Sequence, residues 1–472
     1  MSSNTIELHE QVVVPRTAAD CYRYLADFST IEQWDPSVLR AEKRSQGAPA
    51  AGSRFHLVLS FAGRELPMDY TLDACEPGRS LTLSGHGDGF SALDRITFAE
   101  AGVDADGHPR TRIDYRATLD LGGAPAPARW LVERLMQGAG RRAVTGIRDA
   151  LTVRQSPPGV GLRETVRDRL VLPGMWQFTE AGYREQADKG LTEFMDGQRV
   201  VVTGPTSGIG LAAAKALSRL GASLVLVGRG ADRLQETRSA IRAFSGAPAD
   251  TIDCVDADLL TIEATREAAN RIAERHERVD VLINNAGALF NRRDVTADGH
   301  EQSLAINLIA PWVLTRTLMP KLRAAGGRVI NMASGGMYTQ ALNLDDIEFA
   351  NGRYNGPKAY ARAKRALVAV NEHWAEHEPQ VDFHAMHPGW VATPGVSKSL
   401  PAFERRLQGR LRDARMGADT AVWLASARAV ANDSGRFWFD RKPRATALLP
   451  GTGHTAEQAE ALVHWLTEKA GC

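Results

Sequence analysis

The stretch Thr203-Gly204-Pro205-Thr206-Ser207-Gly208-Ile209-Gly210 decides the fold of the second half of this 472-residue chain. It follows the apolar run 199–202 and precedes the alanine-rich run 211–217, so it predicts a buried strand, a glycine-rich turn and a helix. Glycines let a backbone approach a pyrophosphate, and a helix N-terminus supplies unpaired N–H groups and the positive end of its dipole. Such turns also simply connect strands to helices. The stretch alone therefore favours a phosphate site without establishing one.

Strand-like and helical segments alternate from residue 198 onward. We expect strands over 199–203, 223–227, 251–255, 279–284, 328–332 and 381–386, with helices between them. Alternation of this kind is typical of parallel strands joined by crossover helices, so an α/β doubly wound parallel sheet is predicted. Ligands bind such sheets at the carboxyl ends of the strands.

Polar or glycine-containing motifs follow most of these predicted strands. They are, in order, the glycine turn, Gly228-Arg229, Asp258-Leu259, Asn284-Asn285-Ala286-Gly287, Ser334, the pair Tyr360 and Lys364, and His387-Pro388-Gly389. The ordered set resembles the short-chain dehydrogenase/reductase superfamily over residues 197–440. It is similar to the retinol-dehydrogenase-like branch, through 178–183, 334–337, 386–390 and 435–441 as well. The resemblance implies a Rossmann-type domain that transfers hydride with a nicotinamide cofactor.

Four residues are the expected catalytic group: Asn307, Ser334, Tyr360 and Lys364. Reduction of a carbonyl creates an alkoxide that needs a proton, but the ordinary pKa of tyrosine, ~10, is too high for an efficient base at neutral pH. Lys364 lies one helical turn after Tyr360, so its charge is expected to lower the pKa of Tyr360. Ser334 can donate a hydrogen bond to the substrate oxygen. The resemblance implies that Lys364 also binds the nicotinamide ribose and that Asn307 supports a proton relay. Taken without this context, Tyr360 and Lys364 are compatible with an ordinary pair of exposed residues on a helix.

The resemblance also implies a cofactor site. Its residues are Gly204, Thr206, Ser207, Gly208, Ile209, Gly210, Arg229, Asp258, Leu259, Asn285, Ala286, Gly287, Tyr360, Lys364, Pro388, Gly389, Val391 and Thr393. Arg229 stands where an acidic residue would bind the free 2′-hydroxyl of NAD(H). Because arginine suits a 2′-phosphate by charge and bidentate geometry, we favour NADP(H) over NAD(H). An ordinary surface arginine is the alternative reading of Arg229, and a helix cap that of Asp258.

The first third of the chain has a different pattern, with one strand, a helix, several short strands and a long helix over 128–153. Residues 12–21, 25–28 and 34–36 resemble the START-like, polyketide cyclase/dehydrase superfamily, which implies an α+β helix-grip domain around an apolar cavity. Trp34, Phe55, Phe61 and Tyr115 are candidate lining residues, although each is more often plain core. We expect this ligand-binding domain over 1–155, a linker and amphipathic connector over 156–196, and the Rossmann-type domain over 197–472.

Composition limits the possible partners and compartment. The formal net charge is +1 and no apolar run is long enough to span a bilayer, so neither nucleic acid nor a transmembrane segment is expected. The four cysteines lack metal-ligand spacing and the N-terminus lacks a secretory pattern, which predicts no metal site and a cytoplasmic protein. A membrane-surface helix over the connector is disfavoured because Pro173-Gly174 interrupts it. A homodimer is compatible with the resemblance.

Two functions follow from these observations. The favoured one is an NAD(P)(H)-dependent oxidoreductase that interconverts a lipophilic alcohol and a ketone or aldehyde, with the N-terminal domain binding or presenting a small lipophilic substrate. Residues 395–416 stand where the resemblance implies a loop that covers the substrate, although their mixture of apolar residues and arginines is also typical of an amphipathic surface helix. The other is a hydrophobic-ligand binding or transfer protein whose nucleotide-binding domain is catalytically silent.

Overall fold

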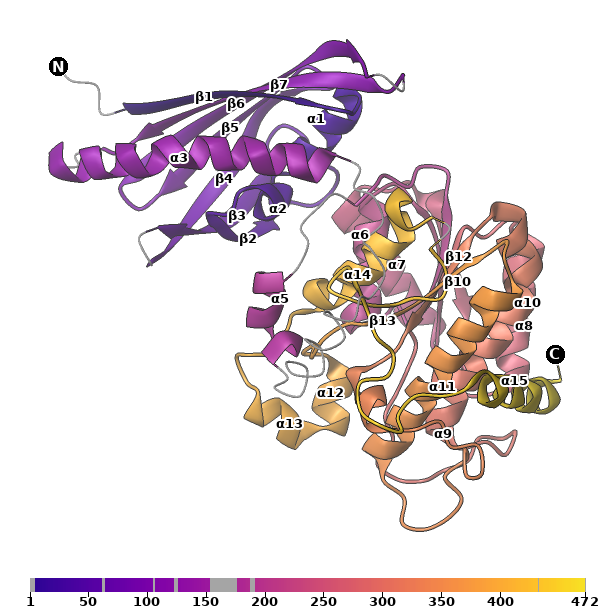
Figure 1. The fold of residues 1–472 in the computed structure, drawn as a ribbon. Helices are drawn as coiled ribbons and strands as arrows, with labels where there is room; N and C mark the ends of the chain where they lie inside the picture. The colour runs from indigo at the N-terminus through magenta and orange to yellow at the C-terminus, as the bar shows by residue number, and fades with distance from the viewer. Residues whose placement is uncertain are drawn as a thin grey trace. The chain divides into compact units, whose positions relative to one another are not determined.

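The chain folds into two compact units in a computed structural model (Figure 1). The structure describes residues 5–61, 64–104, 107–122, 126–152, 176–186, 192–431 and 433–471. Described residues up to 152 belong to the first unit, and those from 176 onward belong to the second. The expected linker at 156–161 and most of the expected connector lie outside the described residues.

The first unit is an antiparallel sheet with a long helix along it (Figure 1). The strand order is β1-β7-β6-β5-β4-β3-β2. The strands are β1 (Thr5–Val14), β2 (Val38–Lys43), β3 (Arg54–Phe61), β4 (Arg64–Glu76), β5 (Ser80–Gly87), β6 (Phe90–Val103) and β7 (Pro109–Asp120). The helices are α1 (Ala18–Ala26), η1 (Phe28–Thr30), α2 (Ile31–Trp34) and α3 (Ala126–Leu151). This arrangement confirms the expected helix-grip domain.

Strand β2 was not expected from the sequence. It lies at the edge of the sheet, where Val38 and Ala41 are buried while Arg40 is exposed. Short edge strands carry charges that discourage pairing with other chains, and those charges weaken the apolar signal. The proposed lining residues Trp34, Phe55 and Tyr115 are buried in the core, with Trp34 edge-on to Tyr115 at 6.2 Å between ring centroids.

The second unit is an eight-stranded sheet in the order β10-β9-β8-β11-β12-β13-β14-β15. Only β15 is antiparallel to its neighbour, so the expected doubly wound parallel sheet is confirmed. The strands are β8 (Arg199–Thr203), β9 (Ser223–Gly228), β10 (Ile252–Asp256), β11 (Val281–Asn284), β12 (Arg328–Met332), β13 (Asp382–His387), β14 (Phe437–Phe439) and β15 (Lys442–Arg444).

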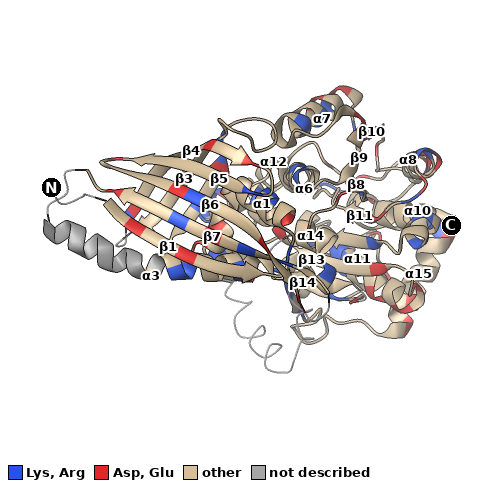
Figure 2. Cartoon of the chain, turned by 90° about the horizontal axis from the view of Figure 1, so that it is seen from above, with Lys and Arg blue, Asp and Glu red and all other residues tan. Residues whose placement is uncertain are grey.

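Helices cover both faces of this sheet (Figure 2). One face carries α6 (Gly208–Arg219), α7 (Ala231–Ser245) and α14 (Ala414–Ser426), and the other carries α8 (Ile262–Arg275), α10 (Ala310–Ala325), α11 (Gly356–His377) and α15 (Ala456–Ala470). Alternate residues of β8 point to opposite faces, since Val201 packs in the core beside α10 and α11 while Val200 and Val202 pack beside α6 and α14.

Shorter elements precede the sheet in the chain or lie in the connections between its strands and helices. They are η3 (Trp176–Phe178), α5 (Glu180–Gln186), η4 (Ala249–Thr251), α9 (Gln302–Leu304), the π-helical turn η5 (Ala305–Ile309), η6 (Gly335–Thr339), α12 (Pro394–Ser399), α13 (Pro401–Arg406) and η7 (Arg428–Val430). The strand order reverses direction between β8 and β11, which places the glycine turn beside Asn285. None of the described helices combines the length and apolar composition that a membrane crossing requires.

Candidate active site

The glycine turn is held open by the end of the neighbouring strand. Thr203 Oγ1 accepts hydrogen bonds from the backbone N–H groups of Asn285 and Ala286 at 3.0 and 2.8 Å. The Asn285 amide in turn donates to Thr203 O at 2.8 Å and to Gly204 O at 3.1 Å. A Cβ at Gly210 would overlap Gly204 O, so only glycine permits this approach. The first strand and its turn are thereby fixed against β11.

The amino end of α6 has the features of a phosphate site. Its N-cap Ser207 makes no capping hydrogen bond with its side chain in the described part of the chain, and the first turn contains no acidic residue. The first N–H groups of a helix have no partner within the helix and stabilise an anion. Gly204 and Gly208 both have positive φ, 65° and 53°, so the turn presents backbone rather than side chains. These residues fit the pyrophosphate of a dinucleotide.

The two residues expected at the adenosine end contact each other. Arg229 Nη1 lies 3.2 Å from Asp258 Oδ2, and both side chains are largely exposed. An exposed ion pair contributes about 0–1 kcal/mol, so a stronger anionic ligand can displace Asp258 from Arg229. Leu259 is buried in the core beside α8. Within this group, Leu259 serves the packing below the site.

A second cluster lies around Asn307 in η5. The Asn307 amide donates to the carbonyls of Ala288 and Ser303, both at 2.8 Å, while its buried Oδ1 finds no partner among the described residues. A Cβ at Gly287 would stand 2.7 Å from that oxygen and 3.4 Å from Lys364 Nζ. The absence of a side chain at Gly287 therefore leaves space beside Asn307 Oδ1, an acceptor without a partner among the described residues. π-helical turns recur at functional sites because the extra residue redirects side chains.

The expected catalytic residues are brought together by α11 and the end of β12. Lys364 is buried and donates to Met332 O at 2.6 Å, and its Nζ lies 5.7 Å from the centroid of the Tyr360 ring. Asn355 caps α11 by accepting from Lys358 N at 3.0 Å, which fixes where the helix begins. Ser334 lies two residues after the end of β12.

The electrostatics of Tyr360 correct one expectation. Burial raises the pKa of Tyr360 to about 12, and a hydrogen bond with Ser334 opposes that rise only in part. Burial also lowers the pKa of Lys364 to about 7. The expectation that Lys364 lowers the pKa of Tyr360 is wrong for this structure, because the lysine is itself desolvated and only partly charged near neutrality.

The Pro388-Gly389 loop closes the site from β13. A Cβ at Gly208 would contact the Thr393 side chain at 3.1 Å, and one at Gly417 would stand 2.6 Å from Val391. Thr393 Oγ1 caps α12 by accepting from Val396 N at 3.3 Å. The structure thus places Val391 and Thr393 beside the glycine turn and the helix that follows it.

Sequence reasoning assigned no role to several residues that hold this site. Thr203 organises the glycine turn, His387 accepts a hydrogen bond from Gly335 N at 3.1 Å, and Arg412 forms a buried ion pair with Asp440. His387 was signalled by its place directly before Pro388. Arg412 had no such signal, because it lies among several arginines and only the fold distinguishes it.

The first unit holds a buried polar cluster of its own. Tyr115 donates to Asp94 Oδ1 at 2.6 Å, and burial raises the pKa of Asp94 to about 6. A separate groove of about 420 Å³ lies between α2 and α3, lined by residues that include Trp34, Arg142 and Thr145. Within the described residues, no group of histidines, cysteines and carboxylates forms a metal site.

Comparisons with known proteins identify both units. Residues 198–402 match the short chain dehydrogenase family, and residues 5–152 match the family described as polyketide cyclase / dehydrase and lipid transport. With the fold and site above, they define the class: the chain belongs to the short-chain dehydrogenase/reductase family and is an enzyme with a nicotinamide cofactor.

Three curated proteins of this family show how similar the chain is to particular relatives. The chain is 38% identical to dehydrogenase/reductase SDR family member 12 of Bos taurus over 304 residues, which is 63% of this chain and 95% of the relative. It is 37% identical to a putative daunorubicin C-13 ketoreductase of a Streptomyces species over 272 residues, or 57% of this chain and 91% of the relative. It is 30% identical to human retinol dehydrogenase 13 over 264 residues, 53% and 78% respectively. The expected likeness to the retinol-dehydrogenase-like branch is confirmed.

Proposed function

We propose that this chain is an NADP(H)-dependent oxidoreductase that interconverts a lipophilic alcohol and a ketone or aldehyde, and that its first unit binds or presents the substrate. The observation that carries the proposal is the space beside Gly287, where the unused Asn307 Oδ1 and the buried Lys364 face a site shared with Tyr360 and Ser334. A protein that only bound nucleotide would have no need for this combination.

Each catalytic residue has a distinct role in carbonyl reduction. The nicotinamide supplies the hydride when bound. Ser334 donates a hydrogen bond to the carbonyl oxygen, and Tyr360 gives its phenolic proton to that oxygen as negative charge develops there. A phenol with a pKa of about 12 is fully protonated at neutral pH and so carries the proton that reduction consumes. The product is an alcohol with one added hydride and one added proton.

Lys364 and Asn307 serve the return of the proton. An amine with a pKa of about 7 gains and loses protons readily at neutral pH. The unpartnered Asn307 Oδ1, 2.7 Å from the position of a Cβ at Gly287, provides an acceptor for a water or a ribose hydroxyl next to that amine. We assign the two residues to a relay that resupplies Tyr360.

The dinucleotide would lie along the carboxyl edge of the sheet. Gly204, Thr206, Ser207, Gly208, Ile209 and Gly210 would hold the pyrophosphate, with Asn285, Ala286, Gly287, Pro388, Gly389, Val391 and Thr393 around the nicotinamide half. Arg229 would bind the 2′-phosphate of NADP(H) after releasing Asp258, which would then face the adenine. A bidentate arginine–phosphate contact is stronger than the exposed pair it replaces.

Apolar side chains near the site support a lipophilic substrate. Trp390, from the Pro-Gly loop, meets Phe403 of α13 edge-on at 5.1 Å between ring centroids. Two relatives are named for retinol and for daunorubicin ketoreduction, so carbonyls of that character belong in the test panel. The family description of the first unit includes lipid transport, which favours a hydrophobic ligand there. A cytoplasmic location and a homodimer remain part of the proposal.

The experiment measures NADPH and NADH binding together with turnover on a panel of lipophilic ketones and aldehydes, for the wild type and Tyr360→Phe. We expect NADPH-dependent turnover that Tyr360→Phe abolishes while NADPH still binds. Equal turnover by both proteins contradicts the mechanism. Tight binding of cofactor and hydrophobic ligands, with no turnover on any carbonyl, favours the alternative of a ligand-binding or transfer protein.

A further inference from the structure

The segment ahead of the parallel sheet packs against Gly335, the residue that follows the expected catalytic serine. The Phe178 side chain is buried, and its ring meets three other rings edge-on. The centroid distances are 4.6 Å to His387, 5.2 Å to Phe439 and 5.6 Å to Trp390. These partners come from β13, β14 and the Pro-Gly loop. Phe178 thus contacts β13, β14 and the Pro-Gly loop at once.

His387 connects Phe178 to the residue after Ser334. Gly335 N–H donates to His387 Nδ1 at 3.1 Å, so the ring proton of the neutral imidazole lies on Nε2. Burial, together with the charge of Arg412, lowers the pKa of His387 to about 3, which keeps the ring neutral. A Cβ at Gly335 would stand 2.9 Å from His387 and 3.2 Å from Phe178. The backbone after Ser334 therefore lies against both rings.

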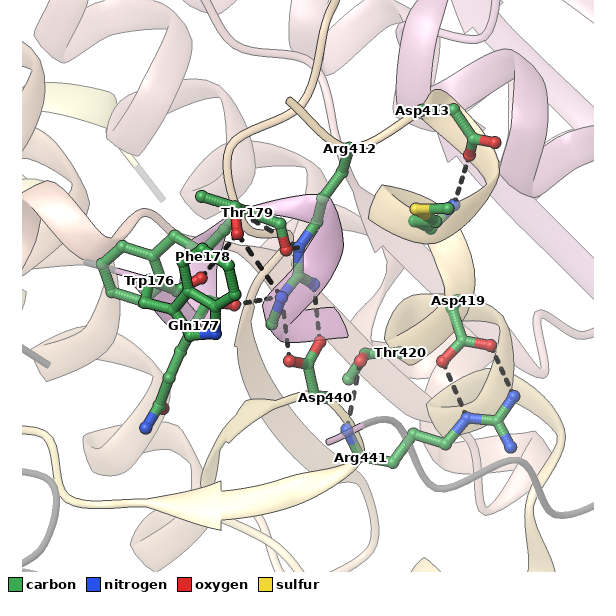
Figure 3. Close-up of polar contacts among 12 residues, drawn as sticks. Trp176, Gln177, Phe178, Thr179, Arg412, Asp413, Asp419, Thr420, Asp440 and Arg441 are labelled. Carbon is green, nitrogen blue, oxygen red and sulfur yellow. Dashed lines mark hydrogen bonds and ion pairs between the residues drawn. The ribbon is translucent and has the colours of Figure 1, made fainter. Parts of the chain in front are cut away.

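Arg412 fixes the backbone that carries Phe178 (Figure 3). Its guanidinium pairs with Asp440 at 2.6 and 2.9 Å, and the two side chains are only 1% and 2% exposed. The same guanidinium donates to Gln177 O at 2.5 Å and to Phe178 O at 3.1 Å. Trp390 N also donates to Phe178 O, at 2.8 Å. Because these bonds involve the backbone, shortening the Phe178 side chain removes none of them.

We propose that Phe178 is a positioning residue for Ser334, which it orients through His387 and the Gly335 amide. The ring of Phe178 holds the imidazole in the plane where Nδ1 receives the Gly335 N–H, and this fixes the backbone that aims the serine hydroxyl. The inference rests on the proposed function for the role of Ser334. It makes part of the segment outside the matched dehydrogenase region necessary for catalysis.

The kinetic test compares Phe178→Ala, Phe178→Leu and the control Trp176→Ala. Trp176 lies in the same turn with half of its surface exposed. We expect Phe178→Ala to lower kcat at least about ten-fold, since a misplacement of ~1 Å can cost ~10²-fold, with the Kd for NADPH unchanged. Phe178→Leu, which refills the space, should recover most of the loss, and Trp176→Ala should retain wild-type values. Wild-type kcat in Phe178→Ala, or equal losses in kcat and NADPH binding, overturns the proposal.

A second readout does not depend on turnover. In ¹⁵N NMR of the wild type, His387 should remain neutral, with an unprotonated Nδ1 at pH 6. In Phe178→Ala and in Phe178→Leu the signals of His387 and of the Gly335 amide should move, more in the alanine variant. Unmoved signals in both variants overturn the positioning role. A wild type that reduces no carbonyl contradicts the proposed function instead, while these NMR signals still decide whether Phe178 acts through His387.

Discussion

Lys364 Nζ donates a 2.6 Å hydrogen bond to the carbonyl of Met332, two residues before Ser334. This bond ties α11, which carries Tyr360, to the strand end that carries the serine. The bond is strongest when the amine is protonated, but burial of Lys364 lowers its pKa to about 7. Replacing Lys364 should therefore remove a contact between α11 and β12 and change how stability depends on pH.

Lys364→Met should alter how stability depends on pH. The pKa of Lys364 is lower in the folded chain than its ordinary value near 10.4, so the unfolded state binds more protons between about pH 7 and pH 10. The cost of burying Lys364 is thus fully present below pH 7 and falls as the pH rises to 10. We expect the difference in melting temperature, variant minus wild type, to become less positive across this window. A difference that is flat from pH 6 to 10 would contradict the lowered pKa.

Gly287→Ala should damage the site without disturbing the fold. The new methyl would fall 2.7 Å from Asn307 Oδ1, so the Asn307 side chain must shift, and it would stand at contact distance, 3.4 Å, from Lys364 Nζ. We expect kcat/KM to fall by about ten-fold or more, which is ~1.4 kcal/mol or more of transition-state stabilisation. Gly453→Ala is the control, because its methyl meets only Ala447 Cβ at an ordinary 3.4 Å. Steady-state kinetics that do not distinguish the two variants would remove Gly287 from the site.

Arg229→Ala should change the choice of cofactor. We expect the KM for NADPH to rise at least about ten-fold, because a bidentate charged contact to the 2′-phosphate is lost. The KM for NADH should stay within about two-fold, because NADH lacks that phosphate. Asp258→Asn, which weakens the competing pair, should bind NADPH at least as well as the wild type. Parallel rises for both cofactors would point to a general role of Arg229 in the loop.

Asp440→Asn should destabilise the second unit. Removing one member of a buried ion pair costs about 3–5 kcal/mol, because the other charge stays desolvated. Asparagine tolerates the positive φ of 50° at this position, so the loss of charge is the main change. Glu180→Gln in the exposed pair with Arg184 should cost below about 1 kcal/mol. Urea unfolding followed by tryptophan fluorescence compares them, and equal costs would show that Arg412 does not depend on Asp440.

The sequence was sufficient to predict the order of the elements, for a physical reason. Apolar strands such as Arg199–Thr203 are buried on both faces and read as continuous runs, and glycine turns follow them at positions that need positive φ. The motifs therefore mark strand ends. By contrast, β2 is short and charged, and the sequence pattern did not predict it.

Contacts between residues far apart in the chain could not be predicted from the sequence pattern. Arg229 and Asp258 lie 29 positions apart, and only the packing of β9 against β10 makes them partners. The raised pKa of Tyr360 depends on burial, which the spacing of Tyr360 and Lys364 does not reveal. Likewise, Arg412 reaches Phe178 across 234 positions. Such contacts depend on the final fold and have no local signature.

We propose that Tyr360 gives the proton during NADPH-dependent reduction of a lipophilic carbonyl. Single-turnover oxidation of bound NADPH, followed at 340 nm with saturating ketone, tests it most directly in the wild type and in Tyr360→Phe. We expect a rapid loss of absorbance in the wild type and a rate at least ~10²-fold lower in the variant, with NADPH bound equally well by both. Equal rates in the two proteins would contradict it.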